Sequence, residues 1–158
     1  MPTFSFDGVG FGIAEPELKE IKMRLTPERE GDVVLALSGD GMITISWGPL
    51  GKAQRHWGDL AGFARQSQRG LEKAIPEKVR DASAEDGWFG GHRAVRTHIR
   101  QREREGWLVP RRAAETLHFY CEPSARYFGL LALMPLSALD RCLPVWNALL
   151  EQFRCHGR

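Results

Sequence analysis

Long apolar runs are missing from this chain of 158 residues. No stretch approaches the roughly 18 consecutive apolar residues that a membrane-spanning helix needs. The N-terminus also lacks a basic region followed by an apolar run, which is the pattern of an export signal. We therefore expect a cytoplasmic protein with no membrane among its partners.

Cysteine is scarce. Its three positions, Cys121, Cys142 and Cys155, cannot all pair within one chain and are too few for a disulfide scaffold. Reduced thiols are the expectation for a chain of this kind. For Cys121 and Cys155 three states stay open at this point: free thiols, a disulfide between them, or ligands of a metal ion.

Recognisable catalytic motifs are absent as well. The sequence has no GxSxG elbow, and the glycines of residues 8–12 are followed neither by the rest of a GxGxxG fingerprint nor by a P-loop lysine. Adjacent acids such as Glu85 and Asp86 lie in segments that read as exposed, where a solvated role is expected. We predict no catalytic residue and no cofactor, and hence a non-catalytic protein.

Composition indicates an ordinary folded domain. Hydrophobic residues make up 42% and charged residues 27% of the chain, and the net charge is +2. Such values are typical of globular proteins. A length of 158 residues fits a single domain over residues 1–158 that buries its own core without metal or disulfide bonds.

The first half of the chain predicts two hairpins and a helix. β-branched and aromatic residues fill residues 32–38 and 42–47, and Gly39, Asp40 and Gly41 between them tolerate positive φ. Apolar residues then recur at helical spacing from Trp57 to Ile75. Residues 4–13 predict a short edge hairpin, and residues 21–25 favour a strand over a helix that begins at Pro16.

The second half predicts antiparallel strands. Residues 76–91 read as a connection, because helix breakers and charges interrupt them. A long strand from Gly91 and a second over residues 114–121 follow, with alternating side chains. If their apolar faces coincide, Ile99 pairs with Leu117 and His98 lies opposite His118.

The last strand and helix complete the architecture. Residues 126–134 are apolar on both sides, which is typical of a strand in the middle of a sheet that helices cover on both faces. Ser137 to Asp140 resembles a capping box, and apolar residues mark one face of a helix that ends near Phe153. The predicted fold is therefore α+β, with a central antiparallel sheet between helices.

This order of elements resembles the PsbP-like superfamily, which includes the extrinsic photosystem II protein and a Ran-binding nuclear import factor. The resemblance lies in an N-terminal hairpin, a helix, a run of antiparallel strands and a closing helix that ends in Leu149-Leu150-Glu151-Gln152-Phe153. It covers most of the chain. It implies an αβα sandwich and a binding or scaffolding protein.

Two groups of side chains are candidate metal ligands. His98 and His118 on adjacent strands are predicted to approach closely enough to share a divalent ion. A second possibility is that the closing helix delivers Cys155 and His156 to the end of the strand at Cys121, so that three or four nitrogen and sulfur ligands converge. The interpretation that we favour over metal binding is a solvated or hydrogen-bonded histidine pair, a buried structural Cys121 and a frayed tail at Cys155.

A third candidate surface combines arginines with tyrosines. Arginines that alternate along one strand are expected to share a face with aromatic rings, which is typical of single-stranded nucleic-acid platforms and of protein interfaces. We rank a protein partner or self-association through this face first, and nucleic acid second. The predicted contact residues are Arg96, Arg100, Arg102, Tyr120 and Tyr127.

Overall fold

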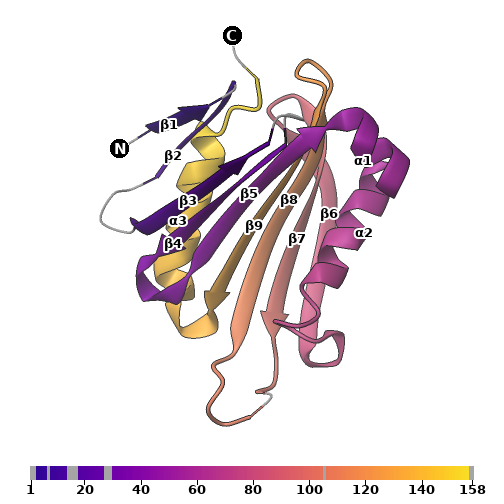
Figure 1. Ribbon diagram of the computed structural model, residues 1–158. Coiled ribbons are helices and arrows are strands. Elements are labelled where there is room, and N and C mark those ends of the chain that lie inside the picture. The colour runs from indigo at the N-terminus through magenta and orange to yellow at the C-terminus, as the bar shows by residue number, and fades with distance from the viewer. Residues whose placement is uncertain (1–2, 7, 14–17, 27–29, 105, 157–158) are drawn as a thin grey trace.

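A seven-stranded antiparallel sheet forms the centre of the fold in our computed structural model (Figure 1). The structure describes residues 3–6, 8–13, 18–26, 30–104 and 106–156. The strands lie in the order β3-β4-β5-β9-β8-β7-β6, which places β9 in the middle. Their bounds are β3 (Leu18–Leu25), β4 (Gly31–Leu37), β5 (Met42–Pro49), β6 (Arg80–Phe89), β7 (His92–Gln101), β8 (Arg112–Cys121) and β9 (Arg126–Pro135).

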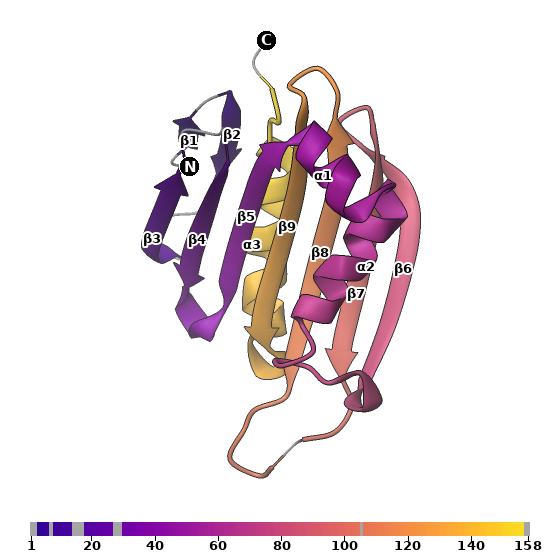
Figure 2. The ribbon, with the colours of Figure 1, turned by 45° about the vertical axis from the view of Figure 1, so that its right-hand side comes forward.

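Helices lie against both faces of this sheet. Figure 2 shows α3 (Leu139–Gln152) on one face, and α1 (Leu50–Trp57) and α2 (Leu60–Gly70) on the other. The hairpin of β1 (Thr3–Phe6) and β2 (Val9–Gly12) forms a separate two-stranded sheet. The fold is therefore α+β, as predicted. Short 3-10 turns lie at η2 (Ser38–Asp40), η3 (Glu77–Val79) and η4 (Leu136–Ala138).

The middle strand β9 is packed on both sides. Phe128 and Leu130 are fully buried in the main core on the α3 face, together with residues of α3 itself. Leu131 and Leu133 point to the other face and pack against the cluster that Leu71 and its neighbours form. This two-sided packing explains why the strand is apolar throughout, and it confirms the central position that the sequence predicts.

Both predicted hairpins of the first half are present. Between β4 and β5, Gly39 and Asp40 have φ values of 78° and 63°, as the turn sequence predicts. Residues 18–25 form strand β3 and pair with β4. The strand prediction is therefore confirmed there, while residues 14–17, where a competing helix would begin, lie outside the described residues.

Among the described residues, no helix is both long enough and apolar enough to cross a bilayer.

Residues 76–91 are not a connection, and this prediction is wrong. Most of the segment is strand β6, which pairs with β7 over its whole length. The strand forms the edge of the sheet, and eight of its ten residues are exposed. Its pattern of small and acidic residues therefore has no apolar alternation from which a strand is predicted.

The helix boundaries also differ from the predicted ones. Gly58 has a φ of 74° and ends α1, and the Asp59 carboxylate then caps α2 by accepting a hydrogen bond of 2.9 Å from the Gly62 N–H. The apolar stripe from Trp57 to Ile75 is thus not one helix. Before α3, the chain makes the η4 turn, and Ala138 takes the N-cap position without a side-chain bond, so the predicted capping box at Ser137 is not formed.

Replacing Gly31 with alanine is expected to lower the free energy of unfolding by about 1–3 kcal/mol. A Cβ atom at Gly31 would lie 2.3 Å from the ring of Trp47, which is 1% exposed and has little room to move. Urea denaturation measures the effect. The matched control is Gly87→Ala in β6, where a Cβ atom meets nothing within 4 Å. Equal stabilities of the two variants would contradict the packing that the structure shows.

Candidate metal centre

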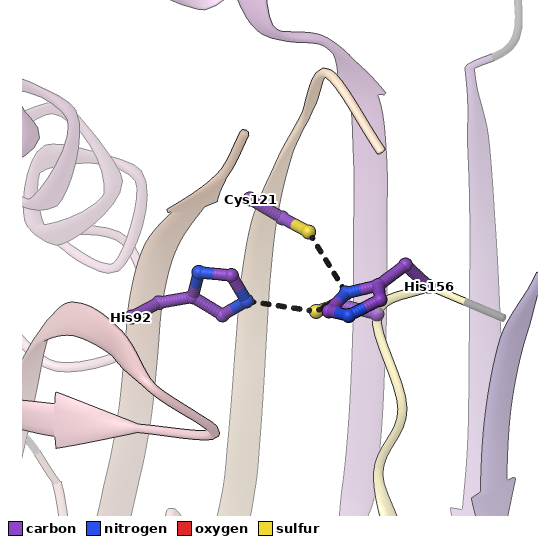
Figure 3. A group of neighbouring side chains, drawn as sticks. His92, Cys121 and His156 are labelled. Atoms are coloured by element: carbon purple, nitrogen blue, oxygen red, sulfur yellow. Dashed lines mark hydrogen bonds between the residues drawn. The ribbon is translucent and has the colours of Figure 1, made fainter. Parts of the chain in front are cut away.

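Four side chains with nitrogen or sulfur donors meet at one end of the sheet. His92 is the first residue of β7, Cys121 is the last residue of β8, and Cys155 and His156 follow α3. Figure 3 shows His92 and Cys121 on neighbouring strands, with the His156 ring beside them. The four residues, called the N2S2 cluster below, come from three separate parts of the sequence.

The pairing of β7 with β8 places the first two members together. Ala94 pairs with Phe119, and the same antiparallel register continued by two residues brings His92 opposite Cys121. The His92 ring also stacks on Phe119, with centroids 5.5 Å apart and an angle of 12° between the planes. The imidazole is therefore held against a buried aromatic ring on the same strand as Cys121.

The segment after α3 brings the other two members. Phe153, at the C-cap, is buried in the main core, which fixes where the helix ends. Arg154 then forms a bridge with Gly10 of β2, with N–H to carbonyl distances of 2.9 and 2.7 Å. Cys155 and His156 come directly after this anchored residue, so their positions follow from backbone hydrogen bonds as well as from side-chain packing.

The distances within the N2S2 cluster suit one tetrahedral ion. Cys155 Sγ lies 3.2 Å from His92 Nε2 and 3.1 Å from His156 Nδ1, and Cys121 Sγ lies 3.4 Å from His156 Nδ1. All four donor atoms are within 4.8 Å of one another. In an ideal tetrahedron, zinc bonds of about 2.3 Å to sulfur and about 2.0–2.1 Å to nitrogen place a sulfur and a nitrogen ligand about 3.6 Å apart.

Burial differs among the four residues in a way that suits a closed site. Cys121 is 0% and Cys155 7% exposed, whereas His92 is partly buried and His156 is exposed. The two sulfurs therefore lie on the protein side. His156 covers the cluster from the solvent side. Protein atoms can therefore occupy all four ligand positions around a tetrahedral ion.

Without a metal ion, the electrostatics of the cluster keep the Cys155 thiol protonated and the His92 imidazole neutral. Burial, and then the neighbouring Cys121, raise the pKa of the Cys155 thiol to about 12. Burial, and then the neighbouring His156, lower the pKa of His92. A nucleophilic cysteine needs a lowered pKa and access to substrate, while a neutral imidazole is the form that binds a metal ion. Zinc displaces the thiol proton when it binds.

The predicted metal pair His98 and His118 is not formed, and the register behind it is wrong. Ile99 pairs with Ala114 instead of Leu117, so the true register differs by three residues. A shift by an odd number exchanges the faces of a strand. His98 therefore shares a face with Glu115, and His118 lies on the opposite face beneath α2, so the two imidazoles cannot bind one ion.

Each of these histidines has a separate environment. His98 Nδ1 is 2.6 Å from Glu115 and its Nε2 is 3.0 Å from Glu85, and the bond to Glu85 is the largest cause of a raised pKa for His98. His118 is 2% exposed and packs edge-on against Phe63, with centroids 4.7 Å apart. Burial lowers the pKa of His118 to about 4.

The predicted surface of arginines and tyrosines is also not assembled. The Arg96 guanidinium lies over the Phe89 ring, 5.8 Å from its centroid. Arg100 forms an ion pair with Glu115 at 3.0 Å, and Arg102 forms one with Asp81 at 3.1 Å. Tyr120 and Tyr127 belong to the opposite face of the sheet, since they alternate with the core residues Phe119 and Phe128. Because the sheet separates the two groups, they do not form one binding face.

His92 is the member of the cluster that the sequence did not reveal. The favoured interpretation of a frayed tail at Cys155 is wrong, because Cys155 is buried and lies with Cys121 and His156. The alternative of converging ligands agrees with the structure, but it named no fourth ligand. The available signal was the position of His92 just after the turn glycines Gly90 and Gly91, whose φ values are 57° and 85°. With the correct register, that position pairs with the end of β8.

Comparisons with known proteins do not assign this chain to a family. No family model matches the sequence, and no curated protein matches it. A search of solved structures finds a protein of unknown function from Pseudomonas aeruginosa, described as a candidate regulator. It has 16% sequence identity and a TM-score of 0.49, over 93% of this chain and 91% of that one. At this similarity we transfer neither its fold nor its description.

Proposed function

We propose that this protein binds one zinc ion through His92, Cys121, Cys155 and His156, and that the ion has a structural role. The observation that carries the proposal is the convergence of four donor atoms, all within 4.8 Å of one another, from three parts of the chain. Two thiols and two imidazoles in a tetrahedral arrangement are the ligand set of structural zinc sites.

A structural role follows from the absence of an open ligand position. Catalytic zinc sites use three protein ligands and keep the fourth position for water or substrate. The N2S2 cluster supplies four protein ligands within the described residues. The ion would join the start of β7, the end of β8 and the segment after α3, three regions that would otherwise be held at this end by packing and the Arg154 bridge.

The direct test is the metal content of the purified protein. Untagged protein from zinc-supplemented cells is expected to contain about one zinc ion per chain by elemental analysis. The double variant Cys121→Ser/Cys155→Ser is expected to contain none, and cobalt is expected to give a tetrahedral thiolate spectrum with the parent protein alone.

Two variants serve as matched controls for this measurement. Cys142→Ser removes the third buried cysteine, which belongs to α3 and lies outside the cluster. His98→Asn removes a histidine of the same strand as His92. Both are expected to keep their zinc. Zinc retained by the double cysteine variant, or parent protein that stays metal-free in the presence of zinc, would exclude the proposed site.

For the remaining properties we propose a single non-catalytic, cytoplasmic binding or scaffolding domain of the PsbP-like superfamily. The layers of helix, antiparallel sheet and helix support the superfamily, and the raised pKa of the buried Cys155 thiol gives no activated nucleophile at that position. A crystal structure superposed on superfamily members tests the fold. A pull-down from the native host tests for a protein partner.

A further inference from the structure

The loop between β7 and β8 carries an exposed apolar tip. Trp107 is 82%, Leu108 78% and Val109 48% exposed, and these three residues are consecutive in the sequence. Figures 1 and 2 both show this loop extending beyond the end of the sheet and beyond the helices. The tip of such a projection does not pack on the rest of the molecule. Removal of its apolar surface from water therefore lowers the free energy.

A small basic hollow lies beside the tip. Its volume is about 200 Å³, and it is lined by Arg104, Pro110, Arg111, Leu136 and Ser137. Among the described residues, none that lines the hollow carries a carboxylate. In the part of the chain that the structure describes, Arg104 and Arg111 bond to the carbonyl oxygens of Trp107 and Arg102, and neither takes part in an ion pair.

We propose that the β7–β8 loop binds the surface of a bilayer that contains anionic phospholipids. A lipid phosphate would lie in the hollow between Arg104 and Arg111, and Trp107, Leu108 and Val109 would enter the interfacial region. Tryptophan is favoured at this depth of a membrane, and arginines near an anionic surface strengthen the attachment. Such surface binding requires no helix that crosses the bilayer, but it replaces the expectation that no membrane is among the partners.

The composition of the tip distinguishes a bilayer from other anionic partners. Single-stranded RNA binds by stacking its bases on aromatic rings, but Leu108 and Val109 offer no ring for a base. Transfer of both side chains from water to a hydrocarbon environment lowers the free energy. A bilayer accepts a projecting apolar tip without a preformed cavity, whereas a protein partner needs a cavity that matches the shape of the tip.

The proposed contact and the zinc site lie at opposite ends of the sheet. The N2S2 cluster includes the start of β7 and the end of β8, and the loop joins the other two ends of these strands. The β7–β8 hairpin would then direct the zinc end away from the bilayer. The two proposals rest on different residues, so each can fail without the other.

Sedimentation with lipid vesicles tests the proposal. The full-length protein is expected to pellet with vesicles of phosphatidylcholine mixed with phosphatidylserine, and not with phosphatidylcholine alone. Arg104→Ala/Arg111→Ala is expected to bind about 30-fold more weakly, since each arginine contributes about fivefold. Trp107→Ser/Leu108→Ser is expected to lose at least about tenfold.

Exposed residues elsewhere provide the controls. Trp88→Ser removes a tryptophan that is 69% exposed, and Arg65→Ala/Arg93→Ala removes two exposed arginines away from the loop. These variants are expected to bind vesicles as the parent does, and all variants are expected to keep the parent melting temperature.

Three results would overturn the proposal. They are failure of the parent to sediment with anionic vesicles, equal binding by the loop variants and the parent, and binding of single-stranded RNA through Arg104 and Arg111 without vesicle binding.

Discussion

Saturation with zinc is expected to raise the melting temperature of the metal-free protein by about 8–16 °C. A ligand present at about 1,000 times its dissociation constant stabilises the folded state by about 4 kcal/mol. For a domain of this size, each kcal/mol corresponds to about 2–4 °C. The stabilisation arises because the four ligands converge only in the folded chain, where zinc joins segments that are distant in sequence.

The change in melting temperature that zinc causes, and not the absolute stability, is the quantity to compare among variants. Replacing a buried cysteine with serine destabilises the fold even without metal, because it buries a hydroxyl group. Cys121→Ser/Cys155→Ser is therefore expected to melt at the same temperature with zinc or with a chelator. Cys142→Ser is expected to show the full shift of the parent. A parent protein that melts alike under both conditions would contradict the structural role of the ion.

Strand and helix types were largely predictable wherever one face of an element is buried and the other is not. The β4–β5 hairpin has this alternation, and its turn residues require the positive φ values that the structure shows. Strand β6 has none, because it forms an exposed edge. Its hydrogen bonds to β7 are a tertiary property that the residue pattern of the segment does not reveal.

The register of β7 and β8 could not be predicted by matching apolar faces. Residues 113–119 of β8 are buried without interruption, because α3 covers one face and α2 the other. A strand that is buried on both sides gives no signal for which face is which, so a shift of three residues leaves the hydrophobic pattern satisfied. Both predicted sites that used this register, His98 with His118 and the arginines with the tyrosines, failed for this reason.

The metal ligands after α3 were easier to predict than His92. Cys155 and His156 follow a helix whose apolar stripe indicates where it packs, so the order of elements allows their convergence with Cys121, although it does not distinguish that convergence from a frayed tail. His92 becomes a ligand only through the correct register and through its stacking on Phe119. Neither is visible in one sequence.

Acidification is expected to destabilise the protein by about 3 kcal/mol through His118 alone. Burial lowers the pKa of this histidine from 6.5 to about 4. The unfolded chain therefore binds a proton as the pH falls below 6.5, whereas the folded chain binds it only near pH 4. Stability is lost across this window, at up to about 1.4 kcal/mol for each pH unit. Urea denaturation between about pH 8 and pH 4, with a chelator present to exclude zinc release, measures the loss.

The variant His118→Leu isolates the contribution of His118 to this loss of stability, because it keeps an apolar side chain beneath α2 and removes the titrating group. Its stability is expected to fall by about 3 kcal/mol less than that of the parent over the same pH range. His98→Asn is the control of opposite sign. Hydrogen bonding to Glu85 raises the pKa of His98, so its contribution is complete below pH 6.5 and is lost as the pH rises through the folded pKa. Parallel pH profiles for His118→Leu and the parent would show that His118 is solvated in the folded protein, contrary to its 2% exposure.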